Sequence, residues 1–323
     1  MSYTYNKFGS RSTTTKINPP TTSTTEIPDV KLDYNNNYVH TNVNPISYIK
    51  NIQNPVDGYP KLIKLHQLKK QQINVHATQA YGKRVETDQI IPVLNSWIKL
   101  GLKFDVIMIG ALVDNQFILP ILNSLPINKL CSKPGFLFIW ASTEKIKELT
   151  KLLNENELNK KFRRSEEIVF LPIDKNSKYY PNQEDNVGLF ENQQWHCWMC
   201  ITGTVRRSTD GDLIHCNIDT DLQIQNNLEN NAVPDLIYKI CENFSNSNRR
   251  LHIIPSKLDE NHYIKLRKGW VIMSPDILLD NFDVIKYNDE LYQKSMIKRQ
   301  DNKDQFLIQV TNEIEQLRPK TPK

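Results

Sequence analysis

Glycine is scarce in this chain, and its placement excludes the commonest nucleotide-binding loops. Ten of the 323 residues are glycine, and none falls in a Gly-x-Gly-x-x-Gly or a Gly-x-x-x-x-Gly-Lys arrangement. Both motifs depend on glycine because backbone N–H groups must approach a phosphate closely. A Gly-x-Ser-x-Gly turn, which positions the serine nucleophile of many hydrolases, is also missing. The sequence therefore has neither a phosphate-cradling loop nor a nucleophile elbow of these kinds.

Long apolar stretches are missing as well. No run approaches the roughly 18 residues of a membrane span, and the first seven residues have no apolar core of the signal-peptide type. Cysteine occurs five times, an odd number spread over a long chain, which is typical of reduced thiols. We therefore expect a soluble intracellular protein, cytosolic or nuclear, with no membrane partner.

The first 36 residues are dominated by Ser, Thr, Asn and Pro and contain few apolar side chains. Such a segment cannot bury enough surface to offset the entropy lost on ordering. We expect a disordered tail over residues 1–36, a folded domain over 37–288, and a peripheral C-terminal helix with a frayed end over 289–323.

The rest of the sequence alternates between short apolar runs and amphipathic segments. Residues 104–114 contain an almost unbroken apolar run, which is typical of a strand buried on both faces in a parallel sheet. Further strands are predicted at 136–140, 168–171, 195–201, 251–254 and 270–273, and helices at 60–68, 90–100, 144–156 and 234–244. Asp210-Gly211 is a strong hairpin signal, with a return strand at 214–218. The pattern predicts an α/β fold with a mostly parallel central sheet and an antiparallel edge hairpin.

The residues that follow the run at 104–109 occupy the place where an active site is expected. In open α/β sheets, ligands bind just past the carboxyl ends of the parallel strands. Gly110, Ala111, Leu112 and Val113 stand at that place. None of these four side chains has a polar atom, so the expected position of an active site carries no side-chain chemistry.

Cys197 and Cys200 form a Cys-x-x-Cys pair with His196, His215 and Cys216 nearby, and metal or redox chemistry is one interpretation. No second pair completes a zinc site, and two strand residues three positions apart point to opposite faces. We favour the other interpretation, in which both cysteines are small buried apolar residues and no metal is bound.

Basic residues are clustered although the total charge is nearly balanced, with 41 basic and 36 acidic residues. The clusters are 160–164, Arg206-Arg207, Arg249-Arg250 and 265–268, all in or near predicted loops at strand ends. Arginine and lysine bind phosphate irrespective of base sequence, so the clusters could form a nucleic-acid face. The alternative is an ordinary solvated surface, since Glu166 and Glu167 follow the first cluster closely.

Several of these segments resemble one protein family. Residues 103–107, 136–140, 203–215 and 249–252, and Gly269-Trp270, are similar to the eukaryotic mRNA adenosine-N6 methyltransferase family. The run Gly-Thr-Val-Arg-Arg-Ser-Thr-Asp-Gly-Asp at 203–212 resembles the non-catalytic partner subunit rather than the catalytic one. Within that subfamily, the fungal karyogamy and meiosis regulator branch is the most similar. The resemblance covers about residues 37–287 and implies a Rossmann-like methyltransferase fold.

The resemblance also assigns expected roles to individual positions. Active members have an Asp-Pro-Pro-Trp loop where this chain has Gly110, Ala111, Leu112 and Val113. Trp195 stands where the catalytic subunit has a lysine that contacts the cofactor. The resemblance therefore implies a pseudo-methyltransferase without a cofactor. Basic positions that the partner subunit has near RNA are matched by Arg163, Arg164, Arg206 and Arg207.

The implied function is that of a nuclear subunit of the mRNA methylation complex. It would form a heterodimer with the catalytic adenosine-N6 methyltransferase subunit, stabilise it, associate with other proteins of the complex, and help to bind mRNA during mating and meiosis. The alternative is a transcription co-regulator that acts with a DNA-bound factor in mating and karyogamy gene expression. A third hypothesis, an active methyltransferase with unconventional residues, is disfavoured by the loop at 110–113.

Overall fold

The structure is a computed structural model of the chain. It describes residues 56, 58–155, 161–172, 174, 176, 177, 179, 195–203, 221–228, 232–258, 263–298 and 304–318. The predicted N-terminal tail and the predicted hairpin turn at Asp210-Gly211, with its return strand, lie outside these residues.

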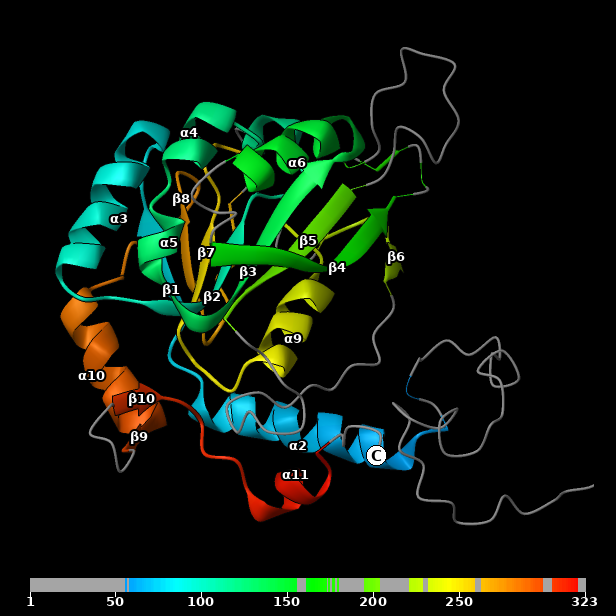
Figure 1. Cartoon of the computed structure of the whole chain (residues 1–323), viewed down its shortest axis with the longest axis vertical. Coiled ribbons are helices and arrows are strands. Elements are labelled where there is room, and N and C mark those ends of the chain that lie inside the picture. Colours follow the sequence, from blue (N-terminus) through cyan, green and yellow to red (C-terminus); the bar gives the residue numbers. More distant parts are fainter. Residues whose placement is uncertain are drawn as a thin grey trace, which may run out of the picture. The chain divides into compact units, whose positions relative to one another are not determined.

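An eight-stranded mixed sheet forms the centre of the fold, in the order β1-β8-β7-β2-β3-β5-β4-β6 (Figure 1). The strands are β1 (Tyr81–Arg84), β2 (Phe104–Ile109), β3 (Cys131–Ser142), β4 (Phe162–Leu171), β5 (Trp195–Thr202), β6 (Leu222–Ile224), β7 (Arg250–Ile253) and β8 (Val271–Ser274). Among the described strands of this sheet, only β5 runs antiparallel to its neighbours, which are β3 and β4. The prediction of an α/β fold with a mostly parallel sheet and an antiparallel part is confirmed.

Helices cover both faces of the sheet. The helices are α2 (Pro60–His76), α3 (Ile90–Lys99), α4 (Leu119–Ser124), α5 (Ile127–Leu130), α6 (Ile146–Glu155), α9 (Asp235–Phe244), α10 (Val284–Ser295) and α11 (Asn312–Gln316). Apolar residues of α3, α4, α5, α6 and α10 pack into one core cluster, which we call the first cluster. Those of α9 pack into a second cluster on the other face. None of the helices in the described part is both long and apolar enough to cross a membrane.

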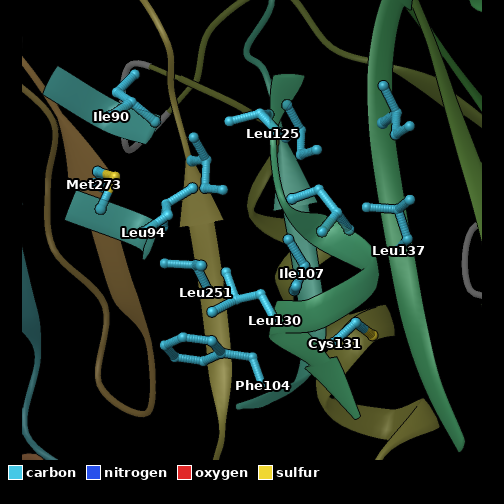
Figure 2. Packing of buried hydrophobic residues seen from close by; sticks show 14 of the residues in the cluster. Ile90, Leu94, Phe104, Ile107, Leu125, Leu130, Cys131, Leu137, Leu251 and Met273 are labelled. Carbon is cyan, nitrogen blue, oxygen red and sulfur yellow. The ribbon is translucent and has the colours of Figure 1, made fainter. Parts of the chain in front are cut away.

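The burial of β2 explains why five of its six residues are apolar, without the alternation of a half-exposed strand. All six of its residues are buried. Ile107 and Ile109 pack into the first cluster, whereas Val106 and Met108 pack into the second. A strand that is covered on both faces needs apolar side chains at successive positions. Figure 2 shows the first cluster around Phe104 and Ile107, where side chains from helices and neighbouring strands meet.

The C-terminal part of the chain is tied to the sheet and to α2. The predicted boundary at residue 288 falls inside α10, whose Tyr287 and Leu291 are both buried in the first cluster. The antiparallel pair β9 (Met296–Lys298) and β10 (Asp304–Phe306) follows. Ile314 of α11 then packs against Leu62 and Leu65 of α2 in a third cluster. The described residues up to α11 therefore share contacts with the rest of the fold.

Candidate nucleic-acid interface and the loop after β2

The first three of the four residues after β2 are built into the protein interior, and the fourth, Val113, is half-buried. Ala111 and Leu112 are 2% and 1% exposed and belong to the second cluster. The backbone N–H of Gly110 donates to the carbonyl of Ile253 at 2.9 Å, and that of Leu112 donates to the carbonyl of Ala232 at 2.9 Å. Both the apolar side chains and the backbone of this segment are thus used in packing. We call these residues the 110–113 loop.

Glycine is required at the first position of this loop. Gly110 has a φ of +93°, in the left-handed region that glycine adopts without strain. A Cβ atom added there would lie 3.3 Å from Cβ of Trp140 and 3.4 Å from its carbonyl oxygen. The backbone path that seats the loop therefore disfavours an aspartate at this position.

A buried hydrogen-bond chain holds the carbonyl of Gly110. His252 of β7 lies with Nε2 2.8 Å from that oxygen, and the hydroxyl of Tyr238 lies 2.7 Å from its Nδ1. Because a carbonyl can only accept, Nε2 carries the proton, and Nδ1 accepts from the hydroxyl of Tyr238. Burial lowers the pKa of His252 to about 4, so the imidazole is neutral. The chain joins α9, β7 and the loop into one unit.

The neutral state of His252 should appear in the pH dependence of stability. In the unfolded chain the imidazole takes up a proton below about pH 6.5, whereas the folded pKa is about 4. Stability is therefore lost as the pH falls from about 6.5 to 4, by about 3 kcal/mol in full. We expect His252→Gln, which keeps an N–H donor for Gly110 without titrating there, to lose less.

Urea unfolding of both proteins at pH 7 and near pH 4.5 tests this expectation. The wild type should lose about 2 kcal/mol more than the variant over that interval. Equal losses would mean that His252 is protonated as readily in the folded protein as in the unfolded chain.

Trp195 lies at the same edge of the sheet as the 110–113 loop. It opens β5, opposite Ser142 at the carboxyl end of β3 and Phe170 near the carboxyl end of β4. It is 7% exposed, belongs to the second cluster, and donates its indole N–H to the carbonyl of Tyr179 at 3.3 Å. The indole is thus a packed core side chain.

The two cysteines of the Cys-x-x-Cys pair point to opposite faces of β5, as predicted. Cys197 packs into the second cluster and Cys200 into the first. Burial raises the pKa of the Cys200 thiol to about 12 and that of Cys197 well above its ordinary value. Within the described residues, no group of three or more His, Cys, Asp or Glu could hold a metal ion.

The arginines of two predicted basic clusters are held inside the protein rather than offered to phosphate, whereas Lys265 and Lys268 are exposed. Arg249 donates through Nε and Nη2 to Asp105, both at 2.7 Å, and Arg250 is fully buried. Arg267 binds Glu242 at 2.7 Å and Asp235 at 2.6 Å. These arginines hold the amino end of β7 and the segment before β8 in place.

Arg163 and Arg164 lie at the other end of the sheet from the 110–113 loop. Phe162, at the start of β4, pairs with Thr202, which in turn pairs with Gly135 near the start of β3. The arginines therefore lie towards the amino ends of the parallel strands, and the side chains of both are exposed. Arg206 and Arg207 lie outside the described residues; Gly203, the last described residue before them, directly follows β5.

Further basic side chains join Arg163 at this edge. Its Nη1 donates to the carbonyl of Gly203 at 2.7 Å, and a Cβ on Gly203 would lie 3.1 Å from Cγ of Lys133. Burial lowers the pKa of Lys161, and the nearby charges of Lys103 and Lys133 lower it further. We call the set of Lys103, Lys133, Lys161, Arg163 and Arg164 the basic edge.

Sequence reasoning missed Lys103 and Lys133 because neither belongs to a basic run. Lys103 directly precedes β2, and Lys133 is the third residue of β3. Since parallel strands begin at the same edge of a sheet, a basic residue near the start of each is the signal that could have found them.

A bulge in β4 places Arg164 beside an acidic residue. Phe162 packs into the first cluster and Ile168 into the second, although an even number of positions separates them. The register shifts between Arg164 and Glu166, so the extra residue Ser165 reverses the alternation of side chains. Arg164 and Glu167 consequently share a face and form an ion pair.

The guanidinium of Arg164 is held on two sides. Its central carbon lies 3.8 Å from the ring centroid of Trp198, which pairs with Glu167 across the strands. Glu167 also lies 2.6 Å from Nδ1 of His196. The Arg164 side chain remains 48% exposed, so a phosphate can approach it from solvent.

Comparison with known proteins places the chain in a family. The MT-A70 profile matches residues 111–265. Karyogamy protein KAR4 of Saccharomyces cerevisiae is 55% identical over 293 residues, which cover 90% of this chain and 84% of that protein. This chain belongs to the MT-A70 family.

More distant MT-A70 relatives are named as non-catalytic subunits. The N(6)-adenosine-methyltransferase non-catalytic subunit METTL14 of Danio rerio is 30% identical over 307 residues, or 90% of this chain and 62% of that protein. The corresponding subunit MTB of Arabidopsis thaliana is 30% identical over 210 residues, or 59% of this chain and 26% of that protein. The predicted resemblance to the non-catalytic branch and its Rossmann-like fold is therefore confirmed.

Proposed function

We propose that this chain is a non-catalytic methyltransferase-like subunit that works by binding. The observation that carries the proposal is the 110–113 loop, which offers no polar side chain and packs Ala111 and Leu112 into the second cluster. The carbonyl of Gly110 is bonded by His252 inside the protein. The chain would form a heterodimer in the nucleus with a catalytic adenosine-N6 methyltransferase subunit, as part of an mRNA methylation complex. The names of the METTL14 relatives support this pairing.

Co-purification tests the pairing. The full chain, tagged and expressed at its natural level, should recover the catalytic subunit in stoichiometric amount, and the pair should elute together in gel filtration. Calorimetry on the isolated chain should detect no S-adenosylmethionine binding. A chain that stays monomeric in the presence of the catalytic subunit, or that binds the cofactor itself, would contradict the proposal.

The proposal includes single-stranded RNA at the basic edge. Lys103, Lys133 and Arg163 are exposed there, and Arg164 presents its guanidinium on the ring of Trp198. Arginine and lysine side chains bind phosphates and release counterions, so affinity should fall steeply with salt. Arg206 and Arg207, which follow Gly203 in the sequence, would extend the same surface.

Charge reversal at the basic edge should weaken RNA binding. We expect Arg163→Glu with Arg164→Glu to reduce the affinity of the complex for single-stranded RNA about tenfold or more at moderate salt. Each lost phosphate contact should also reduce the slope of log K against log salt by about 0.7. Fluorescence anisotropy across a salt series measures both quantities, and Arg206→Glu with Arg207→Glu should act in the same direction.

The matched control reverses two exposed lysines at the opposite edge. Lys147 is the second residue of α6, which follows β3, and Lys257 follows the carboxyl end of β7. Lys147→Glu with Lys257→Glu changes the net charge equally and should leave the salt slope unchanged. Equal effects of the two double variants would mean that RNA responds to total charge and not to the basic edge.

A second function has its own support. The Saccharomyces cerevisiae relative is named as a karyogamy protein, which favours a transcription co-regulator that acts with a DNA-bound factor during mating. Chromatin occupancy that survives RNase treatment and requires a DNA-bound partner would support this role. Occupancy that RNase abolishes would favour the RNA-bound complex instead.

A further inference from the structure

We propose that Ser165 is a phosphorylation site that switches the basic edge off. Ser165 is the extra residue of the β4 bulge and is exposed. Its side chain makes no hydrogen bond to the other residues that the structure describes. Arg163 and Arg164, two of the residues assigned to RNA, precede it directly in the sequence. This inference rests on the proposed RNA-binding function of that edge.

The backbone around Ser165 suits the substrate cleft of a protein kinase. Kinases bind their substrates as extended segments, and β4 is already extended here. Among the described strands, β4 pairs only with β5 at this level, because β6 joins it only at Val169–Leu171. The 163–166 segment is exposed at each position. A kinase that selects arginine before the acceptor serine would find both recognition charges in place.

The chemistry needs a nucleoside triphosphate as the phosphoryl donor. The hydroxyl oxygen of Ser165 forms a bond to the γ-phosphorus while the bond from that phosphorus to the departing nucleoside diphosphate breaks, and the hydroxyl proton is released. The product carries about −1.5 to −2 charge at neutral pH.

The ion pair already present shows how an anion in this place acts. Glu167, three residues after Arg164, holds that guanidinium against Trp198. A phosphate at Ser165 is nearer in sequence, has more charge than a carboxylate, and offers three acceptor oxygens. It would compete with Glu167 for Arg164, which directly precedes it, and would repel the RNA backbone. The modified surface would lose the phosphate contacts that the unmodified one makes.

The test uses the full chain, alone and co-purified with the catalytic subunit. Incubation with a kinase that prefers arginine before serine, and with ATP, should add phosphate at Ser165 by peptide mass mapping, and Ser165→Ala should abolish that signal. The phosphorylated chain and Ser165→Asp should each bind single-stranded RNA about tenfold more weakly. Their salt slopes should be reduced by about 1, between one and two lost contacts.

The control places the same charge on another exposed serine. Ser96 lies on α3, and its hydroxyl donates to the carbonyl of Val93 at 2.6 Å; Ser96→Asp should leave RNA affinity unchanged. Two results would refute the switch and leave the RNA site in place. In the first, the kinase adds no phosphate to Ser165. In the second, Ser165→Asp binds RNA like the wild type while Arg163→Glu with Arg164→Glu binds it more weakly. If Arg163→Glu with Arg164→Glu binds RNA like the wild type, both the RNA site and the switch are refuted.

Discussion

Replacing Asp105 with alanine is expected to lower the free energy of unfolding by about 3 kcal/mol. Its carboxylate accepts two bonds from Arg249, both at 2.7 Å, and further bonds from the hydroxyls of Ser132 and Ser247. Removing it would leave the Arg249 guanidinium without its counter-charge in a place where only 19% of that side chain reaches solvent. An unpaired charge of this kind costs more than the pair itself contributes.

Urea unfolding of the full chain measures this loss. The matched control is Asp280→Ala, which breaks an exposed pair with Lys83 at 3.1 Å and should cost less than about 1 kcal/mol. Asp105→Asn keeps the size of the side chain and should fall between the two. A loss at Asp105 no larger than the loss at Asp280 would show that the buried pair does not stabilise the fold.

The Asp105–Arg249 pair also links the C-terminal segment to the sheet. The guanidinium carbon of Arg249 lies 5.1 Å from the ring centroid of Phe306 in β10, and the N–H of Ile308 donates to the carbonyl of Asn246 at 2.7 Å. Asp105 at the start of β2 thus orients the residue that contacts the C-terminal segment. The Asp105→Ala variant should therefore also loosen β10, seen as faster amide exchange there than in β2.

Local periodicity accounts for the elements that the sequence predicted well. β2 and α9 each bury side chains at the spacing of their own secondary structure, so a short window contains the whole signal. β4 was predicted only over 168–171, because residues 163–166 of the strand are exposed and charged or polar. Pairing with β5, and not an apolar pattern, makes that part a strand.

Some features of the candidate site can be read from the sequence alone. The absence of polar side chains from the 110–113 loop can be read directly from the sequence. The bond from His252 to Gly110 is not, because it joins residues 142 positions apart. Nor can the sequence distinguish Arg249, which is paired internally, from Arg163, which is exposed. Both arginines lie in a polar stretch of sequence at the start of a strand. Only the order of the strands in the sheet shows which of the two is paired inside the protein.

Installing Asp-Pro-Pro-Trp at positions 110–113 is expected to destabilise the protein without producing a methyltransferase. Gly110→Asp places a side chain on a φ of +93°, at a cost of about 1 kcal/mol. Leu112→Pro removes the N–H that donates to Ala232 at 2.9 Å and a side chain that is 1% exposed, at a cost of about 3 kcal/mol or more. The combined loss approaches the roughly 5–15 kcal/mol by which whole domains are stable.

Thermal unfolding and calorimetry with S-adenosylmethionine test the transplanted loop. We expect a large fall in Tm and no cofactor binding, because the core around the loop still holds Trp140 and Trp195. Val113→Trp alone, at a half-buried position, is the control and should be tolerated far better. A transplanted loop that folded normally and bound the cofactor would mean that only these four residues separate the chain from an enzyme. Destabilisation would instead mean that the core has adapted to the present loop. The backbone of Gly110, the hydrogen bond from Leu112 and the hydrogen-bond chain through His252 would then all disfavour the Asp-Pro-Pro-Trp sequence, in addition to the four side chains themselves.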